Sequence, residues 1–209
     1  MRKKHALILF ILLVAGVSQV YAADSKPVYK WVSANEFYFI LPTPQDLYLP
    51  VNKDTTVVHP WGLGFRAVGN GESFSRTGAF QIQSVQATNR SLPESNSFYI
   101  LDLLLGVEYM TPKVQSKPLR FTASALGDFG LCDTTLFMAP VISAGLLYTT
   151  DENAETPTGL TFNIFYRLTD INLNNVGGGQ GGTLNPALGF KVGYIFEGFW
   201  TTKEKSGTT

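Results

Sequence analysis

The sequence has one cysteine, few charged residues and no long hydrophobic run after residue 17. The lone cysteine, Cys132, excludes an internal disulfide framework. Charged residues make up 15% of the chain, whereas an average soluble domain has about 25%. The longest apolar run, residues 6–17, is shorter than the roughly 20 residues that a membrane-spanning helix needs. These absences disfavour both a disulfide-rich domain and a helical membrane protein.

The N-terminus has the three parts of a secretory signal peptide. Residues 2–4 are basic, residues 6–17 are apolar, and residues 20–22 resemble a cleavage site. We predict that residues 1–22 are removed on export; an uncleaved N-terminal anchor is the alternative. Without them, acidic residues outnumber basic residues. The charge balance therefore gives no reason to expect a nucleic-acid partner, which requires a clustered basic surface.

Aromatic residues and glycine are plentiful, and they fall in segments that alternate between apolar and small or polar side chains. In residues 98–110, one face carries six apolar side chains from Tyr99 to Tyr109, and the other includes Asp102 and Glu108. A period of two residues predicts a β-strand. Four further segments show the same alternation clearly: residues 61–67, 119–125, 160–169 and 188–196.

Three weaker segments bring the expected number of strands to eight. They are residues 37–41, extended backward towards Trp31, residues 74–87, and residues 136–149, which contain Pro140. An even number of strands returns both chain ends to the same side of a membrane. On that side we predict the links 69–72, 111–118 and 150–158, the first being a tight Gly-Asn-Gly-Glu turn. On the external side we predict the links 42–56, 88–97, 130–135 and 170–184.

The polar faces of these strands favour a barrel with lipid outside. They are rich in small and uncharged polar residues rather than in the lysine and glutamate that a water-facing surface needs. Such residues fit the filled interior of an eight-stranded barrel. The isolated charges balance in sign and predict an internal ion-pair network: Arg66, Arg120, Arg167 and Lys191 with Asp102, Glu108 and Asp128. Aromatic residues near strand ends predict the girdles of a membrane barrel: Tyr99, Tyr109, Tyr148, Tyr194 and Trp200.

We therefore predict an all-β fold, an antiparallel up-and-down transmembrane β-barrel of eight strands within residues 23–200. Residues 30–200 resemble the small outer-membrane barrels of the OmpA and OmpX type. The spacing of Lys191, Gly193 and Phe196 resembles the C-terminal assembly signal of that class. The resemblance implies the cell outer membrane as location, with membrane lipid and the barrel-assembly machinery as partners. Residues 201–209 depart from the class and are predicted to be a short polar tail.

Candidate catalytic chemistry is sparse. Lipid-modifying outer-membrane barrels use a histidine with a serine or aspartate near the outer rim, and His59 lies where an external link enters a strand. However, neither a serine nor an aspartate stands in a recognisable motif around His59. Asp102 and Glu108 are six residues apart on one strand face, about 20 Å, which is too far for an acid–base pair. We predict no catalytic residue.

Three other motifs also favour simple explanations. The glycine-rich residues 177–182 lack the lysine and helix start of a phosphate loop and are interpreted as an external loop. The acidic residues 151–155 lack the spacing of a calcium site. Residues 89–91 fit a glycosylation acceptor that a bacterial setting leaves unused. No cofactor-binding or metal-binding residue is predicted.

The sequence leaves three functional hypotheses open. The favoured one is a non-enzymatic barrel with a filled interior, acting as a structural part of the membrane or binding a surface ligand through its external loops. The second is a lipid-modifying enzyme centred on His59. The third is a secreted soluble barrel that holds a small apolar ligand inside. A conducting pore is not expected, because eight strands leave no aqueous channel.

Overall fold

A computed structural model describes residues 34–50, 53–68, 74–87, 97–111, 118–132, 134–150, 158–176 and 180–197. The predicted signal peptide, the C-terminal tail, Trp31, Trp200 and the motifs at 69–72, 89–91 and 151–155 lie outside these ranges. The described residues form eleven strands: β1 Ala34–Pro42, β2 Gln45–Leu49, β3 Asp54–Val68, β4 Phe74–Ala87, β5 Ser97–Met110, β6 Leu119–Cys132, β7 Thr135–Thr149, β8 Gly159–Arg167, β9 Ile171–Val176, β10 Gln180–Leu184 and β11 Leu188–Glu197.

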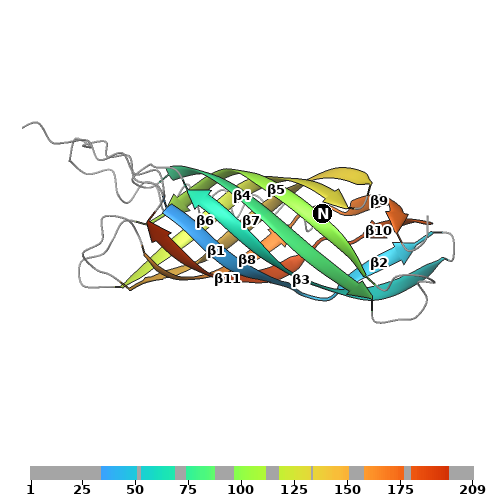
Figure 1. The fold of residues 1–209 in the computed structure, drawn as a ribbon, viewed down its shortest axis with the longest axis horizontal. Coiled ribbons are helices and arrows are strands. Elements are labelled where there is room, and N and C mark those ends of the chain that lie inside the picture. Colours follow the sequence, from blue (N-terminus) through green and yellow to red (C-terminus); the bar gives the residue numbers. More distant parts are fainter. Residues whose placement is uncertain are drawn as a thin grey trace, which may run out of the picture.

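Eight of these strands close into an antiparallel barrel. Their order around the wall is β1, β11, β8, β7, β6, β5, β4 and β3, and β3 pairs again with β1. The closure is seen at Phe37, which is paired with Phe65 on one side and Tyr194 on the other. Figure 1 shows these strands as a tilted cylinder. The predicted fold class and the number of barrel strands are confirmed.

The other three strands lengthen the barrel at one end. β2 pairs with residues 54–58 of β3 and also with β10, and β10 pairs with β9. We call β2, β9, β10 and residues 54–58 of β3 the sheet extension. It lies opposite the end where β1 begins and β11 ends, which we call the terminal end (Figure 1).

The sheet extension corrects the prediction of external links. Residues 42–56 and 170–184 were expected to be loops, yet they contain β2, the start of β3, β9 and part of the glycine-rich segment as β10. The link predicted at 130–135 is also shorter, because β6 continues to Cys132 and β7 begins at Thr135. Backbone pairing explains the difference, since these segments satisfy their amide and carbonyl groups by bonding to one another.

Apolar side chains cover the outside of the eight-stranded wall. Phe37 is 61% exposed and Phe80 is 55% exposed, although both stand in regular strands. The predicted outward faces are confirmed, including Tyr99, Tyr148 and Tyr194 among the expected girdle residues. A soluble barrel with an apolar interior needs the opposite arrangement. Other exposed apolar residues of the wall are Phe39, Leu63, Ile82, Leu101, Leu103, Leu105, Val107, Phe121, Phe129, Phe162, Ile164, Phe190 and Val192.

In the part of the chain that the structure describes, no helix is long and apolar enough to cross a membrane.

The sheet extension has the reverse polarity of the wall. Its inward side chains form a buried apolar cluster with residues from the ends of β4, β5 and β6: Leu47, Leu49, Val58, Val85, Ile100, Cys132, Ile171, Leu173 and Leu184. Its outward side chains include Asp46, Thr55, Asn172 and Asn174, which are exposed. Apolar inside and polar outside is the arrangement of a water-soluble sheet. The outer surface of the extension thus suits contact with water, whereas the outer surface of the wall suits contact with lipid.

Candidate functional site

The interior near the terminal end holds a charged network. Arg66 on β3 lies between two acids, with its Nη2 atom 2.6 Å from Glu36 Oε2 and its Nη1 atom bonded to Glu108 Oε2. The Thr161 hydroxyl donates a further hydrogen bond to Glu36. All four side chains are buried, and they come from four different strands. The network therefore links β1, β3, β5 and β8 across the lumen.

A second polar network lies around Asp102. The side-chain amides of Gln81 and Gln83 both donate to Asp102 Oδ2, at 2.7 and 2.6 Å. The Tyr38 hydroxyl donates to Gln81 Oε1 at 3.2 Å. Lys191 faces inward, with its Nζ atom 4.9 Å from the centre of the Tyr38 ring. The hydrogen bonds to Asp102 Oδ2 and the ring contact of Lys191 thus give these charged groups partners that lipid outside cannot supply.

Arg167 and Asp128 complete the interior charges. Arg167 Nη2 donates to Gln45 Oε1 at 3.0 Å, which joins β8 to the first residue of β2. Asp128 and Arg167 both border an internal cavity of about 10 Å³, together with Lys191 and Gln83. A cavity of that size holds about one water molecule. Side chains therefore fill the interior at this level and leave room for no larger ligand.

The predicted internal charges are mostly placed as expected. Arg66, Arg167, Asp102, Glu108 and Asp128 are buried inside the barrel. Arg120 is only half-buried, and its Nη1 atom lies 4.0 Å from Met110 Sδ rather than near an acid among the described residues.

Sequence reasoning missed Glu36, which is 2% exposed and central to the first network. The signal was present, because Glu36, Tyr38 and Ile40 alternate with Phe37, Phe39 and Leu41.

The outward face of the sheet extension presents a row of polar side chains. The strand registers place Asn172, Thr183, Tyr48 and Thr55 side by side across β9, β10, β2 and β3. Thr183 Oγ1 donates to Asn172 Oδ1 at 3.1 Å. This bond uses the amide oxygen of Asn172, so its amide N–H groups can donate to a ligand. Tyr48 is 43% exposed. Hydroxyl and amide groups thus surround an accessible aromatic ring at the end of the barrel that projects beyond the apolar wall.

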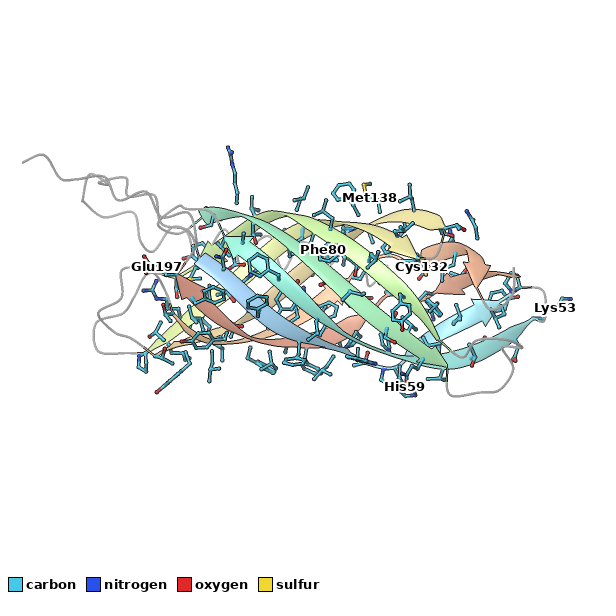
Figure 2. All side chains as sticks on the ribbon, viewed as in Figure 1. Lys53, His59, Phe80, Cys132, Met138 and Glu197 are labelled. Atoms are coloured by element: carbon cyan, nitrogen blue, oxygen red, sulfur yellow. The ribbon has the colours of Figure 1, made fainter. Side chains whose placement is uncertain are left out.

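His59 lies on the outer surface of β3, towards the end that carries the sheet extension (Figure 2). Its partner on β4 is Gln86, and Ser84 stands opposite Trp61 two pairs further along. Within the described ranges, no hydrogen bond or ion pair joins His59 to a serine or an acid. Asp102 and Glu108 belong to separate networks. Among the same residues, no group of three metal-ligating side chains is found.

No protein-family model and no curated protein matches this sequence. Among solved structures, the chain is similar to the outer membrane protein OprG from Pseudomonas aeruginosa, with 12% identity and a TM-score of 0.50 over 81% of this chain and 96% of that chain. Neisserial surface protein A matches with 11% identity over 78% and 95% and a TM-score of 0.37. Ail, the attachment invasion locus protein of Yersinia pestis, matches with 13% identity over 81% and 100% and a TM-score of 0.36. The likeness to OprG is one of fold, and this chain accordingly has the fold of a small antiparallel transmembrane β-barrel.

Proposed function

We propose that this protein lies in the cell outer membrane and binds a surface ligand through its sheet extension, without enzymatic activity. The observation that carries the proposal is the reversal of polarity between the wall and the extension. An apolar outer surface suits the bilayer, and a polar surface over the apolar cluster around Leu47 suits the external water. Because the extension has a polar surface and lies beyond the apolar wall, a partner in the external water can reach it.

The chemistry of the extension favours a polyhydroxylated ligand such as a surface carbohydrate. Tyr48 offers an aromatic ring with a polar tip, which is suited to a partner with both apolar and polar faces. Thr55, Thr183 and Asn172 beside it offer hydroxyl and amide groups that both donate and accept hydrogen bonds. Because this row stands on paired strands, its spacing is fixed before a ligand arrives.

The location is tested by cell fractionation and by the gel mobility of unheated and boiled samples. We expect the protein in the detergent-extracted outer-membrane fraction, with different mobilities before and after boiling. Recovery from the soluble periplasmic fraction without detergent would contradict the membrane location. Sequencing of the mature N-terminus tests the predicted removal of residues 1–22.

Ligand binding is tested on a glycan array with the purified barrel in detergent. We expect the wild type to bind a subset of the glycans and Tyr48→Ala to lose that binding. Tyr99→Ala is the matched control, because Tyr99 is also an outward tyrosine but lies on the wall strand β5. If the wild type binds no glycan, or if both variants bind equally well, the ligand-binding proposal fails and a structural role takes its place.

A further inference from the structure

The outer wall has a hollow of about 630 Å³ near the terminal end of the barrel. Aromatic side chains of β1, β3 and β11 line it, and three of them, Phe37, Phe65 and Tyr194, each lie three residues from the end of their strand. Gly64 and Gly193 also line the hollow, on either side of Tyr38 in the strand register. Apolar groups make up nearly all of the lining. The lining therefore suits an apolar occupant.

Among the described residues, one exposed cation lies on a strand that also lines this hollow. Arg76 of β4 is exposed on the same strand face as Phe80, which lines the hollow. The two residues are four apart, about 14 Å along the strand, and Arg76 is the one nearer the terminal end. Arg76 is the one arginine or lysine on the outward face of the described strands, and no described acid forms an ion pair with it. A guanidinium there has an exposed fork for an anionic oxygen group.

We propose that this surface binds one phospholipid, with an acyl chain in the hollow and the phosphate at Arg76. The proposal rests on the membrane location argued above. Arginine binds phosphate through two parallel hydrogen bonds, and its apolar stem reaches along the wall to the polar boundary. In the proposed orientation the terminal end faces the periplasm, so the bound molecule belongs to the inner leaflet.

A second copy of this chain fits the hollow less well than a lipid does. A symmetric dimer presents the same patch from both partners, so a dimer whose two-fold axis passes through the hollow sets one hollow against the other and leaves a void between them. A void of that kind forfeits dispersion contacts. A thin, flexible acyl chain enters the hollow without this loss, and it needs no matching shape on a rigid surface.

The test is native mass spectrometry of the full mature barrel in detergent with added palmitoyl-oleoyl phosphatidylglycerol. We expect the wild type to retain one lipid per barrel. Arg76→Gln should bind about tenfold more weakly, as expected for the loss of a charged hydrogen bond. Val192→Trp places a large ring in the hollow and should also abolish retention. The controls are Lys53→Gln, which removes an exposed charge beyond β2, and Leu103→Trp, which adds the same ring to another part of the wall.

The possible outcomes separate the alternatives. Equal lipid retention by Arg76→Gln and the wild type would refute the contact between Arg76 and the phosphate. Equal loss of lipid in Leu103→Trp and Val192→Trp would refute the placement of the acyl chain in the hollow. Preferential retention of lipid A, added in equal amount to the same sample, would overturn the choice of phospholipid. If the wild type is a dimer and Val192→Trp is a monomer, the occupant of the hollow is a second copy of this chain rather than a lipid. Arg76→Gln is an exposed change and keeps the test decisive if Val192→Trp does not fold. Glycan binding should be unchanged in both variants, which distinguishes this proposal from that for the sheet extension.

Discussion

Replacement of Arg66 by methionine should destabilise the barrel by about 3–5 kcal/mol, the cost of removing one partner from a buried ion pair. Arg66 is the cation between Glu36 and Glu108, and both carboxyl groups are almost fully buried. Methionine keeps much of the length and apolar volume of the arginine stem. The loss therefore comes from two carboxylates that no longer have their cation in a wall surrounded by lipid.

Urea unfolding in lipid vesicles, followed by the mobility of unheated samples on gels, measures this loss. With a slope of about 1–3 kcal/mol per molar urea, the midpoint should fall by at least about 1 M. Lys53→Met is the matched control, because it removes an exposed charge outside both the interior network and the proposed lipid site. The triple variant with Glu36→Gln and Glu108→Gln should recover much of the stability, since all three charges are then absent. An Arg66→Met midpoint equal to that of the wild type would refute the reasoning.

The remaining predictions concern single positions. Leu103→Arg places a charge on the lipid face and should cost about 2–4 kcal/mol in the same urea assay. Gly64→Val should lower the yield of folded barrel after refolding, because its Cβ atom would overlap the ring of Tyr38. Leu47→Ser should make the sheet extension sensitive to external protease while the wall stays folded, since Leu47 belongs to the apolar cluster of the extension. His59→Ala should leave lipid A composition unchanged in mass spectra of whole cells.

The barrel could be predicted because its strands carry their own signal. In residues 98–110 a change of face at every residue is visible without knowledge of any partner strand, and lipid on one side makes the contrast strong. The same reasoning placed Asp102 and Glu108 inside. Their partners could not be predicted, because Arg66 meets Glu36 and Glu108 only when the register of several strands is fixed.

The sheet extension was predicted as loops for a physical reason. β2 has five residues between prolines at positions 44 and 50, and this composition is typical of turns. Its pairing partner β10 is more than 130 residues away, with Leu47 opposite Leu184. Alternation was nevertheless present in Gln45–Leu49 and Ile171–Asn174, and it was too short to outweigh the turn residues. Pairing between distant segments is thus what the local pattern cannot supply.

The change of polarity along β3 sets the depth at which the barrel sits in a bilayer. Towards its start, Val58 points into the apolar cluster while Thr55 faces outward; towards its end, Arg66 points into the charged network while Phe65 and Leu63 line the outer hollow. Trp61 stands between these two parts, 48% exposed on the outer face. Tryptophan favours the boundary between lipid and water, so we expect the boundary on the side of the sheet extension to fall near this residue. A single continuous strand therefore joins the wall, with its apolar outer surface, to the sheet extension, with its polar outer surface.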